Sequence, residues 1–119
     1  MSVVLDVTAV DNIVDQEQRR GYGLEVARVL KNGGVLLVVT FARNDGYYGP
    51  MLQDSTRREE GVVEDPNTGI RNQLFTDELL MDVFSPPLKT LCRSRLVFVD
   101  EAAEGRWTRR FLIHLYAKT

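Results

Sequence analysis

A chain of 119 residues, 44% of them apolar, is long enough for one domain with a hydrophobic core. Its formal net charge of −2 gives no bulk attraction to nucleic acid or to an anionic membrane. The longest aliphatic run, Val35 to Val39, is far too short to cross a bilayer, and Cys92 is the only cysteine. Because the amino terminus also lacks a secretory signal pattern, we expect a soluble, cytoplasmic protein without a disulfide. We expect paired arginines such as Arg109-Arg110 to lie on a solvated surface.

The first predicted element is a strand over Val3 to Val7, an apolar run that Asp6 interrupts. A run of this kind predicts a buried parallel strand. A carboxylate near its carboxyl end would face the crevice where open α/β sheets bind ligands. The following loop, Thr8 to Val14, carries Asp11 and Asn12.

A helix is predicted from Asp15 to about Lys31. Asp15 is a favourable N-cap, and Gln18 completes a capping-box pattern. Gly21 and Gly23 are poor helix residues, and we attribute them to close packing of the helix on the sheet. The expected buried stripe is Tyr22, Val26, Val29 and Leu30, and the expected solvated residues are Gln16, Glu17, Arg19, Arg20, Glu25 and Arg28.

The stretch from Val26 to Phe41 contains a helix end, a tight turn and a strand. Asn32-Gly33-Gly34 can adopt the left-handed backbone that ends a helix. The following run, Val35 to Val39, is apolar at every position. This pattern predicts a parallel strand covered on both faces, and hence the second half of a βαβ crossover.

The next segment, 42–74, is irregular in pattern and rich in turn signals. We expect a functional lid or a partly disordered region, with short strands or a hairpin over Gly61 to Glu64 and Gly69 to Leu74. Thr76 then caps a short helix, Asp77 to Phe84, which the prolines of Ser85-Pro86-Pro87 end.

Two final strands, Leu91 to Asp100 and Thr108 to Ala117, are predicted to pair antiparallel through a loop with Glu104-Gly105. Parallel strands followed by an antiparallel hairpin indicate an α/β fold, a three-layer sandwich or part of one. His114 is the only histidine, so no zinc site is expected, and we interpret it as a packing residue.

Three segments together resemble class I S-adenosylmethionine-dependent methyltransferases. LEVARVLKNGGVLLVVTF resembles the family's helix-turn-strand, whose pattern is hhRvLkpGGhhhhht with h apolar. VVLDVTAVDNIVD resembles the fourth strand and the loop after it, and RWTRRFLIHLYAKT resembles the last strand. LDVTAVDNIV with the later TF is similar to a small subgroup that includes protein-lysine methyltransferases, and thiol and tellurite methyltransferases have related patterns. The resemblance implies a Rossmann-like sheet of parallel strands with a terminal antiparallel hairpin.

The sequence departs from the family at its amino-terminal side. The family begins with a strand and a glycine-rich turn that approaches the cofactor, followed by an acidic residue that holds the ribose. Neither feature is present, so residues 1–119 are expected to form a single domain equivalent to the carboxyl-terminal half of the fold. A truncated gene would give the same pattern.

The resemblance places Asp6, Asp11 and Asn12 beside the methyl donor. Their alternative roles are a structural acid bonded to loop amides for Asp6, and turn or capping chemistry for the other two. Phe41, Tyr47 and Tyr48 follow the central strand and would line an acceptor pocket. Their alternative role is packing of the long loop.

The leading hypothesis is therefore an S-adenosylmethionine-dependent methyltransferase, or its carboxyl-terminal half, acting on a small molecule or a protein side chain. It would bind the cofactor only where the missing half is supplied. The alternative is a non-catalytic half-domain that acts by self-association or partner binding. In both cases the unpaired edge at Val3 to Val7 would join a second copy or a partner chain.

Overall fold

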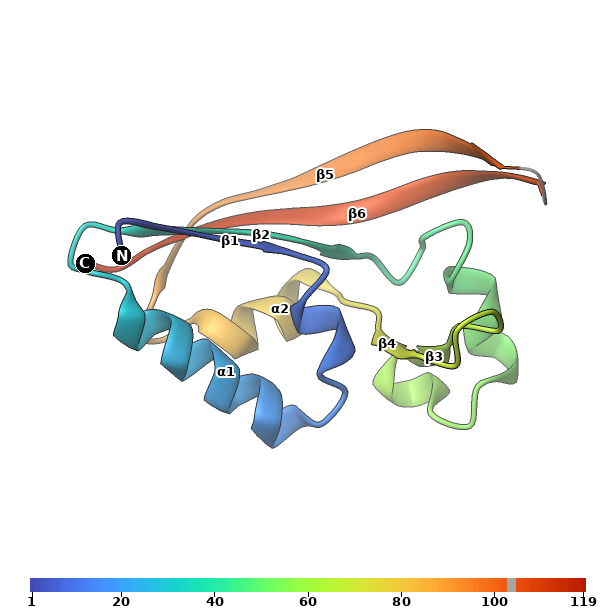
Figure 1. Ribbon diagram of the computed structural model, residues 1–119, viewed down its shortest axis with the longest axis horizontal. Coiled ribbons are helices and arrows are strands. Elements are labelled where there is room, and N and C mark those ends of the chain that lie inside the picture. The colour runs from blue at the N-terminus through green and yellow to red at the C-terminus, as the bar shows by residue number, and fades with distance from the viewer. Residues whose placement is uncertain (103–104) are drawn as a thin grey trace.

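The computed structural model describes residues 1–102 and 105–119 as an α/β arrangement (Figure 1). A four-stranded sheet in the order β1-β2-β6-β5 packs on two helices, and a two-stranded sheet pairs β3 with β4. The predicted α/β class with parallel and antiparallel strands is confirmed. The strands are β1 (Val3–Val7), β2 (Val35–Phe41), β3 (Val62–Glu64), β4 (Arg71–Gln73), β5 (Lys89–Ala102) and β6 (Gly105–Ala117), the α-helices are α1 (Gln16–Val29) and α2 (Asp77–Phe84), and the short 3-10 helices are η1 (Val10–Asn12), η2 (Gly49–Asp54) and η3 (Arg58–Glu60).

Strands β1 and β2 are parallel neighbours, as the crossover pattern predicts. Val3 is opposite Val35, and Val7 is opposite Val39. The N-cap of α1 also forms as predicted, since the Asp15 carboxylate accepts a hydrogen bond from Gln18 N at 2.9 Å. The helix ends at Val29, and Gly33 in the turn before β2 has a φ of 82°, the left-handed conformation expected there.

The last two strands form a long antiparallel arm, in which β6 lies between β2 and β5. The predicted hairpin is confirmed, and β5 starts two residues before Leu91. The expected loop residue Glu104 lies outside the described residues.

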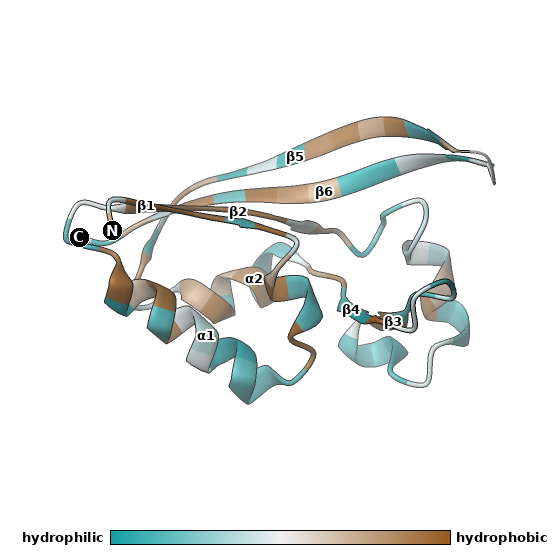
Figure 2. Cartoon of the chain, in the orientation of Figure 1, coloured by the Kyte–Doolittle hydropathy of each residue, from teal (hydrophilic) through white to brown (hydrophobic). Residues whose placement is uncertain are grey.

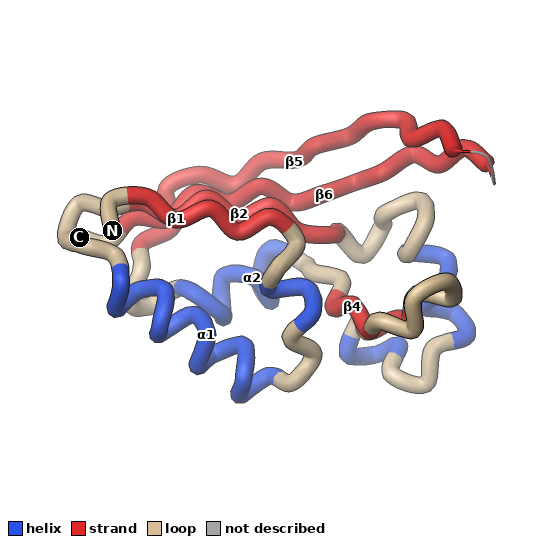
Figure 3. Tube along the Cα trace, viewed as in Figure 1, coloured by secondary structure: helices blue, strands red, loops and turns tan. Residues whose placement is uncertain are grey.

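Only one face of the sheet is covered by helices (Figures 1 and 3). The β2 side chains alternate, with Leu36, Val38 and Thr40 buried toward the helices and their neighbours half-buried. The prediction that helices cover both faces of this strand is therefore wrong for the described residues, which hold two of the three layers. Both β1 and β2 are hydrophobic over most of their length (Figure 2), so the uncovered face is apolar as well.

Two interpretations of α1 need correction. The two glycines do not pack on the sheet: Gly21 is exposed, and Gly23 packs against α2, because a Cβ there would lie 1.9 Å from the Val83 carbonyl oxygen. Arg19 is 5% exposed rather than solvated. Its guanidinium donates to Ile13 O at 3.0 Å and to Gln73 Oε1 at 2.9 Å, so α1 is tied to β4.

The segment after β2 has a folded structure of its own. Strands β3 and β4 form the predicted hairpin, and Val63, Leu74 and Tyr48 form a second small core beside it. Helix α2 has its predicted bounds, and the Thr76 hydroxyl accepts from Leu79 N at 3.2 Å. Over residues 1–102 and 105–119, no helix combines the length and hydrophobicity that a membrane crossing requires.

Candidate functional site at the carboxyl ends of β1 and β2

Asp6 is a buried carboxylate that the surrounding backbone and one tyrosine satisfy. Its Oδ1 accepts hydrogen bonds from Ala9 N at 3.0 Å and Val10 N at 3.3 Å, and its Oδ2 accepts from the Tyr22 hydroxyl at 2.5 Å. Burial, together with this hydrogen bond, raises the pKa of Tyr22, so the phenol stays a donor. These contacts shape the turn after β1, where Thr8 has a φ of 58°. The structure thus gives Asp6 the hydrogen-bonding role named as its alternative.

Asp11 links the turn after β1 to the end of β2. One carboxylate oxygen accepts from the Thr40 hydroxyl, and the other accepts from Phe41 N at 2.8 Å. Burial raises the pKa of Asp11 to about 7, against the opposing effect of these hydrogen bonds. The turn after β1 and the end of β2 are therefore joined through one acid whose pKa lies near neutral pH.

The Asp11→Asn variant is expected to remove a pH-dependent loss of stability. The folded-state pKa of Asp11 lies above its unfolded value, so its contribution to stability is complete below about pH 4 and is lost as pH rises through about 7. Each pKa unit corresponds to about 1.4 kcal/mol. Urea unfolding gives the free energy of unfolding of both proteins at an acidic and at a slightly alkaline pH. Relative to the native protein, the variant should be more stable by a few kcal/mol at the alkaline pH than at the acidic pH. An equal difference at both pH values would contradict this result, and the exposed Asp54→Asn serves as the control.

Asn12 is exposed, unlike the two acids beside it. Every carboxylate oxygen of Asp6 and Asp11 accepts at least one internal hydrogen bond. The described residues contain no group of three side chains suited to hold a metal ion.

Phe41, Tyr47 and Tyr48 lie together at the end of β2, as predicted. The ring centroids of Phe41 and Tyr48 are 4.9 Å apart, and those of Tyr47 and Tyr48 are 5.0 Å apart. Tyr48 is buried, and its hydroxyl donates to Asp65 Oδ2 at 2.7 Å. Tyr48 thus forms the interior of the cluster, while Phe41 and Tyr47 are half-buried.

Arg109 is the principal residue that the sequence interpretation missed. Its side chain is 13% exposed, although the Arg109-Arg110 pair was expected to be solvated. Its guanidinium carbon lies between 5.4 and 5.7 Å from the ring centroids of Phe41, Tyr47, Tyr48 and Phe111. Arg109 Nε donates to Asp45 Oδ1 at 2.8 Å, so this cation is enclosed by aromatic rings and paired with a buried acid.

A cleft of about 430 Å³ opens beside this cluster, with Tyr47, Trp107 and Arg109 among the residues that line it. The Tyr47 and Trp107 centroids are 4.9 Å apart, and their planes meet at 81°. Trp107 had no role in the sequence interpretation. The alternating pattern of β6 could have placed Trp107 and Arg109 on the same side of the sheet as Phe111.

Two other places in the structure do not form part of this site. His114 is buried, with Nδ1 2.7 Å from the Tyr116 hydroxyl and Nε2 2.7 Å from Asp77 Oδ1, on the helix-covered face. The Arg95 guanidinium holds the pKa of Asp77 down to about 2, and burial lowers the pKa of His114.

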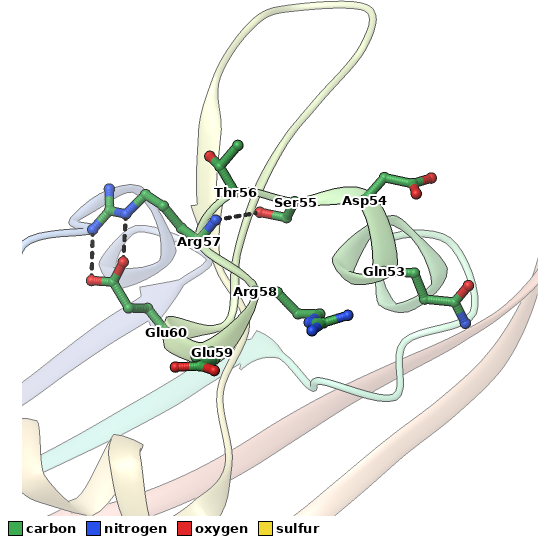
Figure 4. A pocket seen from close by; sticks show the side chains of 8 residues that line it. All are labelled: Gln53, Asp54, Ser55, Thr56, Arg57, Arg58, Glu59 and Glu60. Atoms are coloured by element: carbon green, nitrogen blue, oxygen red, sulfur yellow. Dashed lines mark hydrogen bonds and ion pairs between the residues drawn. The ribbon is translucent and has the colours of Figure 1, made fainter.

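A hollow over residues 53–60 has an internal Arg57–Glu60 ion pair at 2.8 Å, and its other side chains point in different directions (Figure 4).

The comparisons with known proteins identify a fold and no sequence family. No protein-family model and no curated protein matches the chain. Three solved structures described as SAM-dependent methyltransferases do match. The protein from Methanosarcina mazei has 22% identity and a TM-score of 0.75, that from Anabaena variabilis 17% and 0.63, and that from Clostridium acetobutylicum 14% and 0.60.

These alignments cover 99%, 97% and 99% of this chain, but 59%, 48% and 58% of the solved structures. The chain therefore shares their fold over nearly all of its length and spans about half to three-fifths of theirs.

Proposed function

The chain has a class I SAM-dependent methyltransferase-like fold, and we propose that it supplies the acceptor side of such an enzyme. The observation that carries this proposal is the fold of the chain, which matches the Methanosarcina mazei structure with a TM-score of 0.75 over 99% of the chain. At the carboxyl ends of β1 and β2, the aromatic cluster would position a methyl acceptor and exclude water. The acceptor is a small molecule or a protein side chain.

The donor-binding side is proposed to come from polypeptide that joins β1. When bound, SAM supplies an activated methyl group, so the chain's own task is orientation rather than proton chemistry. The sequence lacks the glycine-rich turn of the family, and Asp6 and Asp11 are occupied by internal hydrogen bonds. Asn12 remains as the exposed residue at this edge that would border the donor.

Two features of the sheet support this arrangement. Strand β1 is the outermost strand, with no further strand beyond it among the described residues. On the face without helices, Val3, Leu5 and Val7 are 53%, 67% and 63% exposed. An edge with free backbone groups beside an apolar face is a surface suited to a further strand and its covering helices.

A chimera tests the proposal. The part of the Methanosarcina mazei protein outside the matched 59% would be fused to residues 1–119. Calorimetric titration with SAM is expected to show binding by the chimera and none by the isolated chain. Asn12→Ala in the chimera should weaken binding several-fold, whereas Asn32→Ala, an exposed asparagine at the opposite end of β2, should not. A folded chimera that fails to bind SAM would refute the proposal.

The second candidate function is self-association of a non-catalytic half-domain, which the exposed β1 face favours. In that case the isolated chain should sediment as a dimer at tens of micromolar, and Leu5→Lys should convert it to a monomer by placing a charge on this face. Leu24→Lys is the control, because Leu24 is 48% exposed on α1. A native chain that remains monomeric at high micromolar concentration would remove this candidate.

A further inference from the structure

We propose that the cleft between Tyr47 and Trp107 binds an organic ammonium group, the amine of the methyl acceptor. The proposal rests on the proposed function only in calling the ligand an acceptor, since the binding site itself is argued from its walls and charges.

The walls of the cleft form an aromatic corner. Tyr47 and Trp107 meet nearly at right angles, with centroids 4.9 Å apart. Asn67 Nδ2 donates to the Tyr47 hydroxyl at 3.4 Å, which helps to fix that ring. Met51 and Pro66 complete the apolar lining. Faces of aromatic rings carry negative potential, so such a corner attracts a cation that is large and weakly hydrated.

The charges at the cleft leave one carboxylate unbalanced. Arg109 is paired with Asp45, whose side chain is fully buried, at 2.8 Å. Asp100 lies farther from the same guanidinium, at 3.7 Å, and its side chain is 45% exposed at the mouth of the cleft. Two carboxylates thus face one guanidinium, and the surplus negative charge is on the residue that solvent can reach.

This balance favours an ammonium ligand over a carboxylate ligand. A carboxylate that approached Arg109 would meet Asp100 and would compete with a buried ion pair. An ammonium group would contact the Tyr47 and Trp107 rings and pair with Asp100. Arg109 already lies over the Tyr47 ring, 5.5 Å from its centroid, so Trp107 and Asp100 supply most of the attraction. The volume of about 430 Å³ admits either a free amine or a lysine side chain.

Trp107 is the only tryptophan, so its fluorescence reports directly on the cleft. The isolated chain is titrated with choline and with its neutral isostere, in which a quaternary carbon replaces the nitrogen. Choline is expected to cause a saturable change, and the isostere to bind roughly fivefold more weakly. Binding of a lysine peptide is compared with binding of butylamine to distinguish the two sources of the ammonium group. Tighter binding of the peptide identifies a protein acceptor, and equal binding identifies a small amine.

Asp100→Asn is expected to weaken choline binding about threefold. Glu101→Gln is the matched control, because Glu101 is the next residue on β5 and is 69% exposed. Equal binding of choline and its isostere, tighter binding of benzoate than choline, or no effect of Asp100→Asn would overturn the proposal. None of these titrations uses SAM, so their outcome is separable from that of the chimera.

Discussion

Replacing Asp45 by alanine is expected to lower the free energy of unfolding by about 3 to 5 kcal/mol. The Asp45 carboxylate is 1% exposed and accepts hydrogen bonds from Tyr48 N and Arg110 N, both at 2.9 Å, as well as from Arg109. Its removal leaves a guanidinium among four aromatic rings without its buried partner. It also leaves backbone amides unpaired. Urea unfolding followed by circular dichroism measures the loss.

The matched control uses the other carboxylate of the same arginine. Asp100 is 3.7 Å from Arg109 and half-exposed, so Asp100→Asn should change the free energy of unfolding by no more than about 1 kcal/mol. If the two variants lost similar amounts of stability, the Asp45–Arg109 pair would not be the contact that holds the turn after β2 against β6.

Gly23→Ala is expected to destabilise the fold by about 3 kcal/mol or more, because it overpacks the contact between α1 and α2. The added Cβ would lie 1.9 Å from the Val83 carbonyl oxygen and 2.9 Å from its carbon, which are backbone atoms that cannot move without shifting a helix. Thermal unfolding of the variant should therefore show a much lower midpoint, and calorimetry gives the corresponding free energy.

Gly21→Ala provides the contrasting result on the same helix. No atom outside the neighbouring helix backbone lies within 4 Å of a Cβ at Gly21, so alanine should raise the free energy of unfolding by up to about 1 kcal/mol through its better helix propensity. Equal effects of the two substitutions would mean that Gly23 is not at a close helix contact.

The order of elements was predictable because local signals agreed with the global fold. Thr76 and Asp15 are N-caps in the structure as in the sequence pattern, and the apolar run after Gly33 forms the strand beside β1. The elements that pack on each face of β2 were not predictable. An apolar run indicates that both faces avoid water, but it does not indicate which polypeptide covers each face.

The candidate site was predictable only in part. Phe41 and Tyr47 were located by their place after a parallel strand. Arg109 and Asp45 were missed because they are buried as a pair although they lie 64 residues apart in the sequence. A local sequence pattern cannot indicate such a pairing. Arg19 was missed for the same reason, since its partner Gln73 lies 54 residues farther along the chain. Asp11 was singled out for a place beside the methyl donor, and in the structure its bond to Phe41 N links the turn after β1 to the end of β2.

Amide hydrogen exchange of β1 tests most directly whether donor-binding polypeptide pairs with this strand, as we propose. In the isolated chain, the β1 amides that point away from β2 should exchange rapidly, because no strand lies beyond them among the described residues. In the chimera with the Methanosarcina mazei segment, the same amides should become protected by a new strand. Equally rapid exchange of these amides in the isolated chain and in a folded chimera would contradict the account.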